Sequence, residues 1–156
     1  MTTDETVLTA SFAAGCFWGV QERFDALPGV IDSQVGYSGG TKPNPTYEHV
    51  CGGNTGHAET VQVTYNPSVI SYEQLLQVFW DNHDPTTKDR QGPDIGNQYR
   101  SVIFYHSLKQ QQEAQQSKDE LEQSGKYADP IVTQIIAALP FYPAEDYHQH
   151  YYRQRR

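Results

Sequence analysis

The chain alternates between short apolar segments and segments of helical period, and this order limits the folds that it can adopt. β-Strands are predicted where apolar residues run together or alternate with polar ones. These stretches are residues 7–13, 30–37, 61–65, 102–105 and 131–136. Glycine or proline follows several of them, so each predicted strand is short.

Three helices are predicted between these strands. The first has apolar residues at helical spacing over residues 17–27 and stops at the Pro-Gly pair that follows. The second begins at a capping box of Ser71 and Gln74, and the third is a polar helix over residues 107–125. The order of strands and helices predicts an α+β fold. We expect a two-layer domain with a mixed β-sheet and a split βαβ, ferredoxin-like core.

Two polar stretches rich in glycine and proline, residues 41–56 and 82–99, are predicted to be long loops. Loops of this length in a compact domain are more often functional than idle. A length of 156 residues suits one domain. We therefore expect a single domain over residues 1–156, with flexible ends at 1–6 and 153–156.

The composition argues against several classes of function. With 11 Lys and Arg against 19 Asp and Glu, the net charge of −8 disfavours a nucleic-acid surface. The basic cluster of Arg153, Arg155 and Arg156 is interpreted as a solvated tail. No apolar run is long enough for a membrane span, and residues 1–6 are unlike a signal peptide. Two cysteines are too few for a disulfide framework, so we expect a cytoplasmic protein with reduced thiols. A monomer is also expected, although no feature of the sequence fixes the oligomeric state.

Cys16 lies where the first strand gives way to the first helix. Backbone N–H groups and the helix dipole can stabilise a thiolate there, which is the reactive form of cysteine. A small buried side chain is an equally good interpretation from position alone. Trp18 favours a reactive cysteine, because it lies about 100° around the helix from Phe17 and off the apolar stripe. It is interpreted as the floor of a ligand pocket, with an edge-of-core tryptophan as the alternative.

The segment Gly15-Cys16-Phe17-Trp18-Gly19 resembles the signature of the class A methionine sulfoxide reductases, which act on the S epimer of the sulfoxide. The resemblance continues in the family's order from about residue 8 to residue 152. The other matching segments are Gly36-Tyr37-Ser38-Gly39-Gly40, Asn44-Pro45-Thr46-Tyr47, Thr55-Gly56-His57-Ala58-Glu59, Gln91-Gly92-Pro93-Asp94-Ile95-Gly96-Asn97-Gln98-Tyr99-Arg100-Ser101 and Phe141-Tyr142-Pro143-Ala144-Glu145-Asp146.

The resemblance implies the chemistry of the site. Cys16 matches the nucleophile, Glu59 matches the catalytic acid, and Phe17 and Trp18 match the pocket that holds the substrate methyl group. A sulfoxide oxygen leaves only if it gains a proton as the thiolate attacks the sulfur. Glu59 must therefore be protonated near neutral pH, which requires a pKa raised by desolvation and neighbouring negative charge. The products are methionine and Cys16 sulfenic acid.

Three further residues match groups that bind the substrate and assist catalysis. Tyr47 and Tyr99 match hydroxyls near the sulfoxide oxygen, where they would donate hydrogen bonds as charge develops. Asp94 matches a carboxylate that organises the site and its water. Taken alone, the tyrosines could be loop-packing aromatics, Asp94 a turn former and Glu59 a surface carboxylate. The joint match to the family favours the functional interpretation.

No metal or other cofactor is expected apart from an external thiol reductant. The histidines show no ligand spacing with the two cysteines and are interpreted as surface or hydrogen-bonded residues. They are His49, His57, His83, His106, His148 and His150.

Recycling of oxidised Cys16 is the point where the chain departs from many family members. Those members resolve the sulfenic acid with tail cysteines, whereas residues 151–156 contain none and Cys51 is the other cysteine here. We expect thioredoxin, or glutathione with glutaredoxin, to reduce Cys16 through a mixed disulfide. A Cys16–Cys51 disulfide is the alternative, which needs Cα atoms within about 7 Å.

The expected substrates are oxidised proteins and free methionine sulfoxide. Two rival functions remain at this point. One is a different Cys16 thiol enzyme, such as a peroxidase or an acyl-transfer enzyme, although no spacing points to a histidine base. The other is a module that binds the sulfoxide without turnover, which Glu59 argues against.

Overall fold

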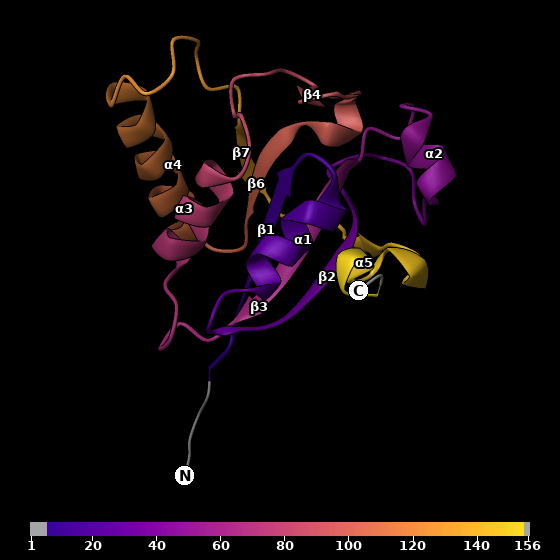
Figure 1. Ribbon diagram of the computed structural model, residues 1–156, viewed down its shortest axis with the longest axis horizontal. Coiled ribbons are helices and arrows are strands. Elements are labelled where there is room, and N and C mark those ends of the chain that lie inside the picture. The colour runs from indigo at the N-terminus through magenta and orange to yellow at the C-terminus, as the bar shows by residue number, and fades with distance from the viewer. Residues whose placement is uncertain (1–5, 155–156) are drawn as a thin grey trace.

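A six-stranded sheet forms the centre of the computed structural model, which describes residues 6–154 (Figure 1). Its strands are β1 (Leu8–Ala14), β2 (Val30–Ser38), β3 (Ala58–Tyr65), β6 (Ser101–Tyr105), β7 (Gln134–Ala137) and β8 (Tyr142–Pro143). Their order across the sheet is β7-β6-β1-β3-β2-β8. Of the ends predicted to be flexible, residues 1–5 and 155–156 lie outside the described residues.

The pairing of the strands produces the predicted core. β3 lies antiparallel between β1 and β2, so β1 and β2 run parallel to each other with a strand inserted between them. β6 pairs antiparallel with β1, and β7 pairs parallel with β6, which makes the sheet mixed. The order β6-β1-β3-β2 is that of a split βαβ, ferredoxin-like core. The predicted α+β fold class is confirmed.

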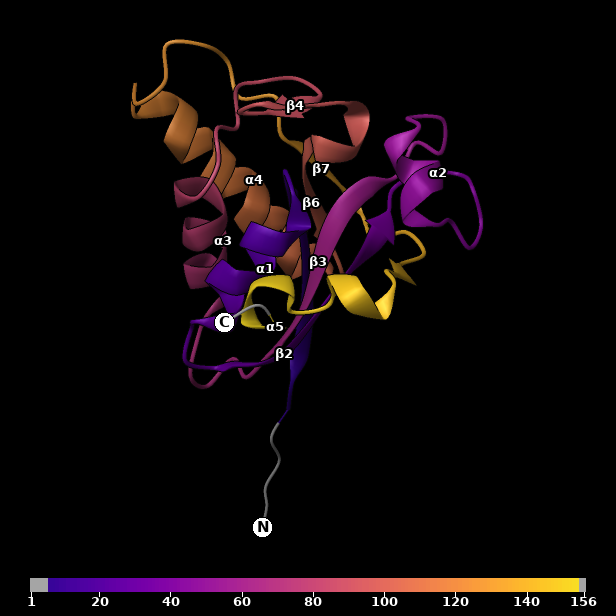
Figure 2. The same cartoon turned by 45° about the vertical axis from the view of Figure 1, so that its right-hand side comes forward.

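The main helices form the second layer. They are α1 (Phe17–Asp25), α3 (Tyr72–Asp81) and α4 (Leu108–Gln123). Side chains from all three join those of the strands in one apolar core, and α3 and α4 lie side by side in both views (Figures 1 and 2). At its centre, Phe12 of β1 packs against Phe24 of α1 and Phe79 of α3, with ring centroids 5.1 and 5.3 Å away.

The predicted caps fix where α3 and α4 begin. The Ser71 hydroxyl accepts the Gln74 N–H at 3.1 Å, and the Gln74 side chain accepts the Ser71 N–H at 2.8 Å. Ser107 accepts the N–H of Gln110 at 3.1 Å. The first N–H groups of a helix have no partner within the helix, so these side chains supply one.

The two stretches predicted as loops contain short regular elements, and the prediction was incomplete there. These elements are α2 (Tyr47–Cys51), β4 (Arg90–Gln91), β5 (Asp94–Ile95) and the 3₁₀ helix η1 (Asn97–Tyr99). α2 begins at a capping box of Thr46 and His49, in which a histidine replaces the usual Glu or Gln. β4 and β5 pair as a small antiparallel hairpin.

The C-terminal segment, residues 141–154, lies against α1 and β2 (Figure 2). After β8 it contains a 3₁₀ helix, η2 (Asp146–His148), and α5 (Tyr151–Gln154). Gln21, which the apolar pattern of α1 did not mark as buried, is 0% exposed and accepts the His150 N–H at 2.6 Å. Arg153 is exposed, as expected of a solvated tail, but lies 3.3 Å from Asp25. Arg155 and Arg156 are outside the described part of the chain.

Candidate active site

A sharp turn between β1 and α1 places Cys16 at the N-terminus of the helix. Gly15 has φ +96°, a conformation that favours glycine, and Cys16 is the N-cap residue of α1. A Cβ at Gly15 would lie 2.8 Å from Cγ of Gln91, which is part of β4. The turn therefore also brings the β4–β5 hairpin close to Cys16.

The Cys16 thiol is half-buried, and burial raises its pKa to about 11. The N–H groups of Trp18 and Gly19 act in the opposite direction, while the carboxyl groups of Glu59 and Asp94 raise the pKa further. The helix start thus favours the thiolate as expected, but burial outweighs it. In the resting site Cys16 is a protonated thiol.

Glu59 is the second residue of β3 and is only 2% exposed. Its Oε1 accepts the N–H of Phe17 at 3.1 Å, whereas its buried Oε2 has no hydrogen-bond partner. Burial raises the pKa of Glu59 to about 8; the Phe17 N–H lowers it, and the charge of Asp94 raises it. The predicted raised pKa is confirmed, and the Glu59 carboxyl group is bound to the N–H of Phe17, the residue that follows Cys16.

The remaining polar site residues come from the two stretches that were predicted as loops, residues 41–56 and 82–99. Tyr47 is the first residue of α2, Tyr99 is the last residue of η1, and Asp94 begins β5. Burial raises the pKa of Tyr99 to about 12, and the charges of Glu59, Cys51, Asp94 and Cys16 raise it further. Burial also raises the pKa of Tyr47. Both hydroxyls therefore remain hydrogen-bond donors around the same group of charges.

Phe17 and Trp18 occupy different environments. Phe17 is 0% exposed and packs under the site against the rings of Tyr37 and His148, at 5.8 and 5.3 Å. Trp18 is half-buried, and its indole stacks on Tyr151 with ring centroids 3.7 Å apart and an interplanar angle of 7°. Phe17 thus belongs to the core, while Trp18 belongs to an aromatic wall.

Sequence reasoning missed the residues that complete this wall. Trp18 Nε1 donates to Nδ1 of His148 at 2.9 Å, and the ring of Tyr47 lies 4.4 Å from that of His148. His148 and Tyr151 come from the C-terminal segment, after the matching residues 141–146, and no pattern in the sequence placed them at the site. Glu145, which lies within the matching residues 141–146, accepts the N–H of Tyr47 at 3.0 Å.

Acidic, cysteine and histidine side chains are the kinds that hold metal ions in proteins. Among residues 6–154, no set of three or more His, Cys, Asp or Glu side chains is arranged to hold a metal ion. The histidines instead form hydrogen bonds, such as those of buried His57 with the Gly40 N–H and the Lys42 carbonyl. None of the helices in this part of the chain combines the length and the apolar character needed to cross a membrane.

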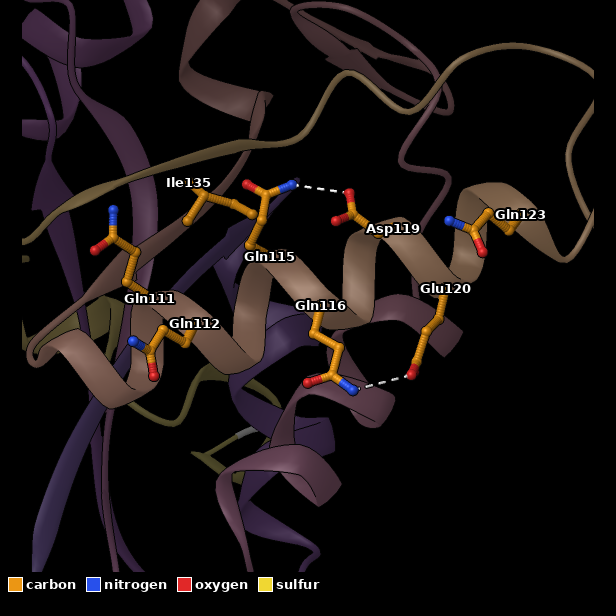
Figure 3. A pocket seen from close by; sticks show the side chains of 8 residues that line it. All are labelled: Gln111, Gln112, Gln115, Gln116, Asp119, Glu120, Gln123 and Ile135. Atoms are coloured by element: carbon orange, nitrogen blue, oxygen red, sulfur yellow. Dashed lines mark hydrogen bonds between the residues drawn. The ribbon is translucent and has the colours of Figure 1, made fainter.

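A groove elsewhere on the surface is unrelated to Cys16. Figure 3 shows that it follows the glutamine-rich face of α4, where Gln115 and Gln116 donate to Asp119 and Glu120 one turn further on. The other lining residues are Gln111, Gln112, Gln123 and Ile135. No cysteine or histidine lines this groove, so it is separate from the thiol chemistry of Cys16.

The group beside the thiol determines the class of enzyme. Acyl-transfer cysteine enzymes usually place a base next to the thiol, most often histidine. The group near Cys16 is instead the carboxylic acid of Glu59, which keeps its proton at neutral pH. Such an acid can protonate a substrate oxygen while the Cys16 sulfur attacks the substrate. Fold and site together therefore indicate a cysteine-dependent oxidoreductase.

Comparison with known proteins identifies the family within this class of enzymes. The family model for peptide methionine sulfoxide reductase matches residues 8–156. Peptide methionine sulfoxide reductase MsrA of Methanoculleus marisnigri is 57% identical, and the alignment covers 99% of this chain and 94% of that protein. The chain belongs to the peptide methionine sulfoxide reductase family and is an enzyme of that activity.

Solved structures agree with this assignment. Mxr1 from Saccharomyces cerevisiae in its reduced form matches with a TM-score of 0.90 at 37% identity, covering 99% of this chain and 88% of Mxr1. Mxr1 in complex with Trx2 matches with a TM-score of 0.66 at 28% identity, covering 97% of this chain and 89% of that one.

Proposed function

We propose that this enzyme reduces the S epimer of methionine sulfoxide, both in proteins and as the free amino acid, with Cys16 as nucleophile and Glu59 as acid. The observation that carries the proposal is the Glu59 carboxyl group. It is buried, its pKa is about 8, and its Oε2 lacks a partner, so it is ready to donate a proton. A buried acid without such a role would be costly to keep.

In the proposed reaction the Cys16 sulfur attacks the sulfoxide sulfur. The thiol loses its proton, and Glu59 delivers a proton to the sulfoxide oxygen as the S–O bond breaks. The attack forms a bond between the two sulfurs, and this bond breaks as the protonated oxygen moves from the substrate sulfur to Cys16, so one sulfoxide and one thiol become one methionine and one sulfenic acid. The thiol proton restores Glu59, which keeps atoms and charge in balance.

The other site residues bind and orient the substrate. Trp18 holds the substrate methyl group by apolar contact, and the buried Phe17 supports this wall by packing against His148, the ring to which Trp18 is bonded. Tyr47 and Tyr99 donate hydrogen bonds to the oxygen, where charge develops during the attack. Asp94 contributes negative charge that raises the pKa of Glu59 and of Cys16, and so keeps the acid protonated.

An external thiol then reduces Cys16 sulfenic acid through a mixed disulfide and releases water. The yeast relative Mxr1 in complex with Trx2 supports a thioredoxin as that thiol, and glutathione with glutaredoxin is the second candidate. A Cys16–Cys51 disulfide is the alternative route. We further propose that residues 1–156 act as one domain and as a cytoplasmic monomer.

A turnover assay with resolved epimers tests this function. The enzyme is incubated with L-methionine (S)- or (R)-sulfoxide and dithiothreitol, and methionine is measured. We expect methionine from the S epimer alone and none with Cys16→Ser, since a hydroxyl is a poor nucleophile at neutral pH. Cys51→Ser is the matched control for loss of a thiol and should remain active. Turnover of the R epimer, or an active Cys16→Ser variant, would contradict the proposal.

A further inference from the structure

Glu145 joins three parts of the structure that are distant in sequence. Its Oε1 accepts the hydroxyl of Tyr37 in β2 at 2.9 Å, and its Oε2 accepts the backbone N–H of Tyr47 at 3.0 Å. Nε2 of His148, one turn further along, lies 4.0 Å from Oε1. Each carboxylate oxygen thus has a donor from a different element, which fixes the orientation of the group.

His148 connects this carboxylate to Trp18. The indole Nε1–H can only donate, so Nδ1 of His148, at 2.9 Å, must be the acceptor and carry no proton. In the neutral ring the proton is then on Nε2, the nitrogen that faces Glu145. A separation of 4.0 Å is too long for a hydrogen bond. The contact is electrostatic, and a negative charge at Glu145 favours the tautomer that Trp18 requires.

Tyr47 is held by the same pair of residues from two directions. Its N–H is bound by Glu145, and its ring lies 4.4 Å from the imidazole of His148. His148 itself is 0% exposed, so its ring cannot turn without displacing its neighbours. Movement of the Glu145 carboxylate would therefore change the positions of both Tyr47 and Trp18.

We propose that Glu145 is a positioning residue of this site, which sets Tyr47 through its backbone N–H and Trp18 through the tautomer of His148. The inference rests on the proposed function, in which these two aromatic residues meet the oxygen and the methyl group of the sulfoxide. Burial alone would raise the pKa of Glu145, but the donors around it prevail and the pKa lies below that of an ordinary glutamate. The carboxylate is therefore charged at neutral pH, as the tautomer requires.

Glu145→Gln with Glu120→Gln as its matched control tests the proposal. Both substitutions keep the shape of the side chain and remove its charge, but Glu120 is exposed on α4, where its carboxylate accepts the side chain of Gln116. We expect Glu145→Gln to lower kcat/KM for the S sulfoxide roughly tenfold, through both kcat and KM. Glu120→Gln should keep kcat/KM. Equal kcat/KM values in the two variants would reduce Glu145 to a structural role.

A second readout does not depend on turnover. The indole N–H of Trp18 is followed by NMR in ¹⁵N-labelled protein, with Trp80, which donates to Ser117 at 2.7 Å, as the internal reference. Glu145→Gln should shift the Trp18 resonance and leave that of Trp80 in place, and an unmoved Trp18 resonance would overturn the proposal. If the unmodified enzyme reduces no sulfoxide, the proposed function fails while this shift still tests the Glu145–His148–Trp18 link.

Should Glu145→Gln not fold, His148→Phe provides the same test from the other side. Phenylalanine keeps the aromatic ring but offers no acceptor to Trp18, while the bond from the Tyr47 N–H to Glu145 remains. We expect KM to rise about threefold to tenfold with little change in kcat, together with a shifted Trp18 resonance. An unchanged KM with an unchanged resonance would likewise overturn the proposal.

Discussion

Glu59 holds its proton at neutral pH because the fold buries it, and this has a cost in stability. A glutamate has a pKa near 4.5 when exposed, and that of Glu59 is about 8 in the fold. The folded state therefore binds this proton more tightly than the unfolded state does. The contribution of Glu59 to the free energy of unfolding is therefore fully present below pH 4.5 and is lost as the pH rises toward 8. The protein is thus less stable at neutral pH than it would be without this buried acid, and in exchange the site holds a proton donor at that pH.

Glu59→Gln should therefore stabilise the protein at neutral pH. Glutamine cannot ionise, so the variant escapes the pH-dependent loss. The gain should be on the order of 3 kcal/mol at pH 7 and vanish near pH 4. Urea unfolding at both pH values measures it. A difference between the two proteins that does not depend on pH would mean that Glu59 ionises as an ordinary glutamate.

The same substitution should slow catalysis, because the oxygen loses its proton donor. We expect the rate of sulfoxide reduction to fall about 10²–10⁴-fold with little change in substrate affinity. Because the proposed reaction starts with both Cys16 and Glu59 protonated, kcat/KM should fall along a limb near pH 8, where Glu59 loses its proton. Stopped-flow measurements on Glu59→Gln should show no limb near 8. Persistence of that limb would assign it to another group.

At the scale of elements, the turn between β1 and α1 carries Cys16 and also supports the hairpin that carries Asp94. Gln91 is central to this contact, because its side chain binds both the N–H and the carbonyl of Asp84, each at 2.8 Å, while packing on Gly15. A side chain at Gly15 would have to displace Gln91. The position of the nucleophile and that of the hairpin are therefore linked.

Gly15→Ala should test this link. Gly125→Ala is the control, because its φ of +75° brings a similar backbone strain while no atom lies within 4 Å of the added Cβ. Both variants should lose about 1–3 kcal/mol of stability from the strained backbone. Only Gly15→Ala should also lose kcat/KM, since it displaces Gln91. Equal kinetics in the two variants would show that the hairpin does not depend on the turn.

For the whole molecule, the features that the sequence predicted are those set by residues close together in the chain, and the features that it missed depend on contacts between distant residues. The caps at Ser71 and Ser107 and the order of strands are local patterns, and the structure confirmed them. The raised pKa of Cys16 is not local, because it depends on burial by the complete fold. The bond from Trp18 to His148 spans 130 residues, so no local pattern around either residue indicated that His148 completes the site.

The route by which the oxidised enzyme is recycled depends on whether Cys51, the last residue of α2, can reach Cys16. A capping box fixes the start of this helix, and the Glu145 carboxylate binds its first N–H. Just beyond Cys51, the Gly53 carbonyl accepts the side chain of Asn97 at 3.3 Å. A disulfide with Cys16 would need Cα atoms within about 7 Å, and any movement of α2 would have to break these contacts. We therefore expect an external thiol to reach oxidised Cys16 first.

Intact-mass spectrometry of the reduced protein, treated with one equivalent of the S sulfoxide and no reductant, distinguishes the routes. A gain of one oxygen, trapped by a sulfenic-acid probe on Cys16, is expected, because no second thiol attacks it. Added thioredoxin should then restore the reduced mass. The matched variant is Cys51→Ser, which should behave in the same way. Quantitative loss of two hydrogens, abolished by Cys51→Ser, would instead make Cys51 the resolving cysteine.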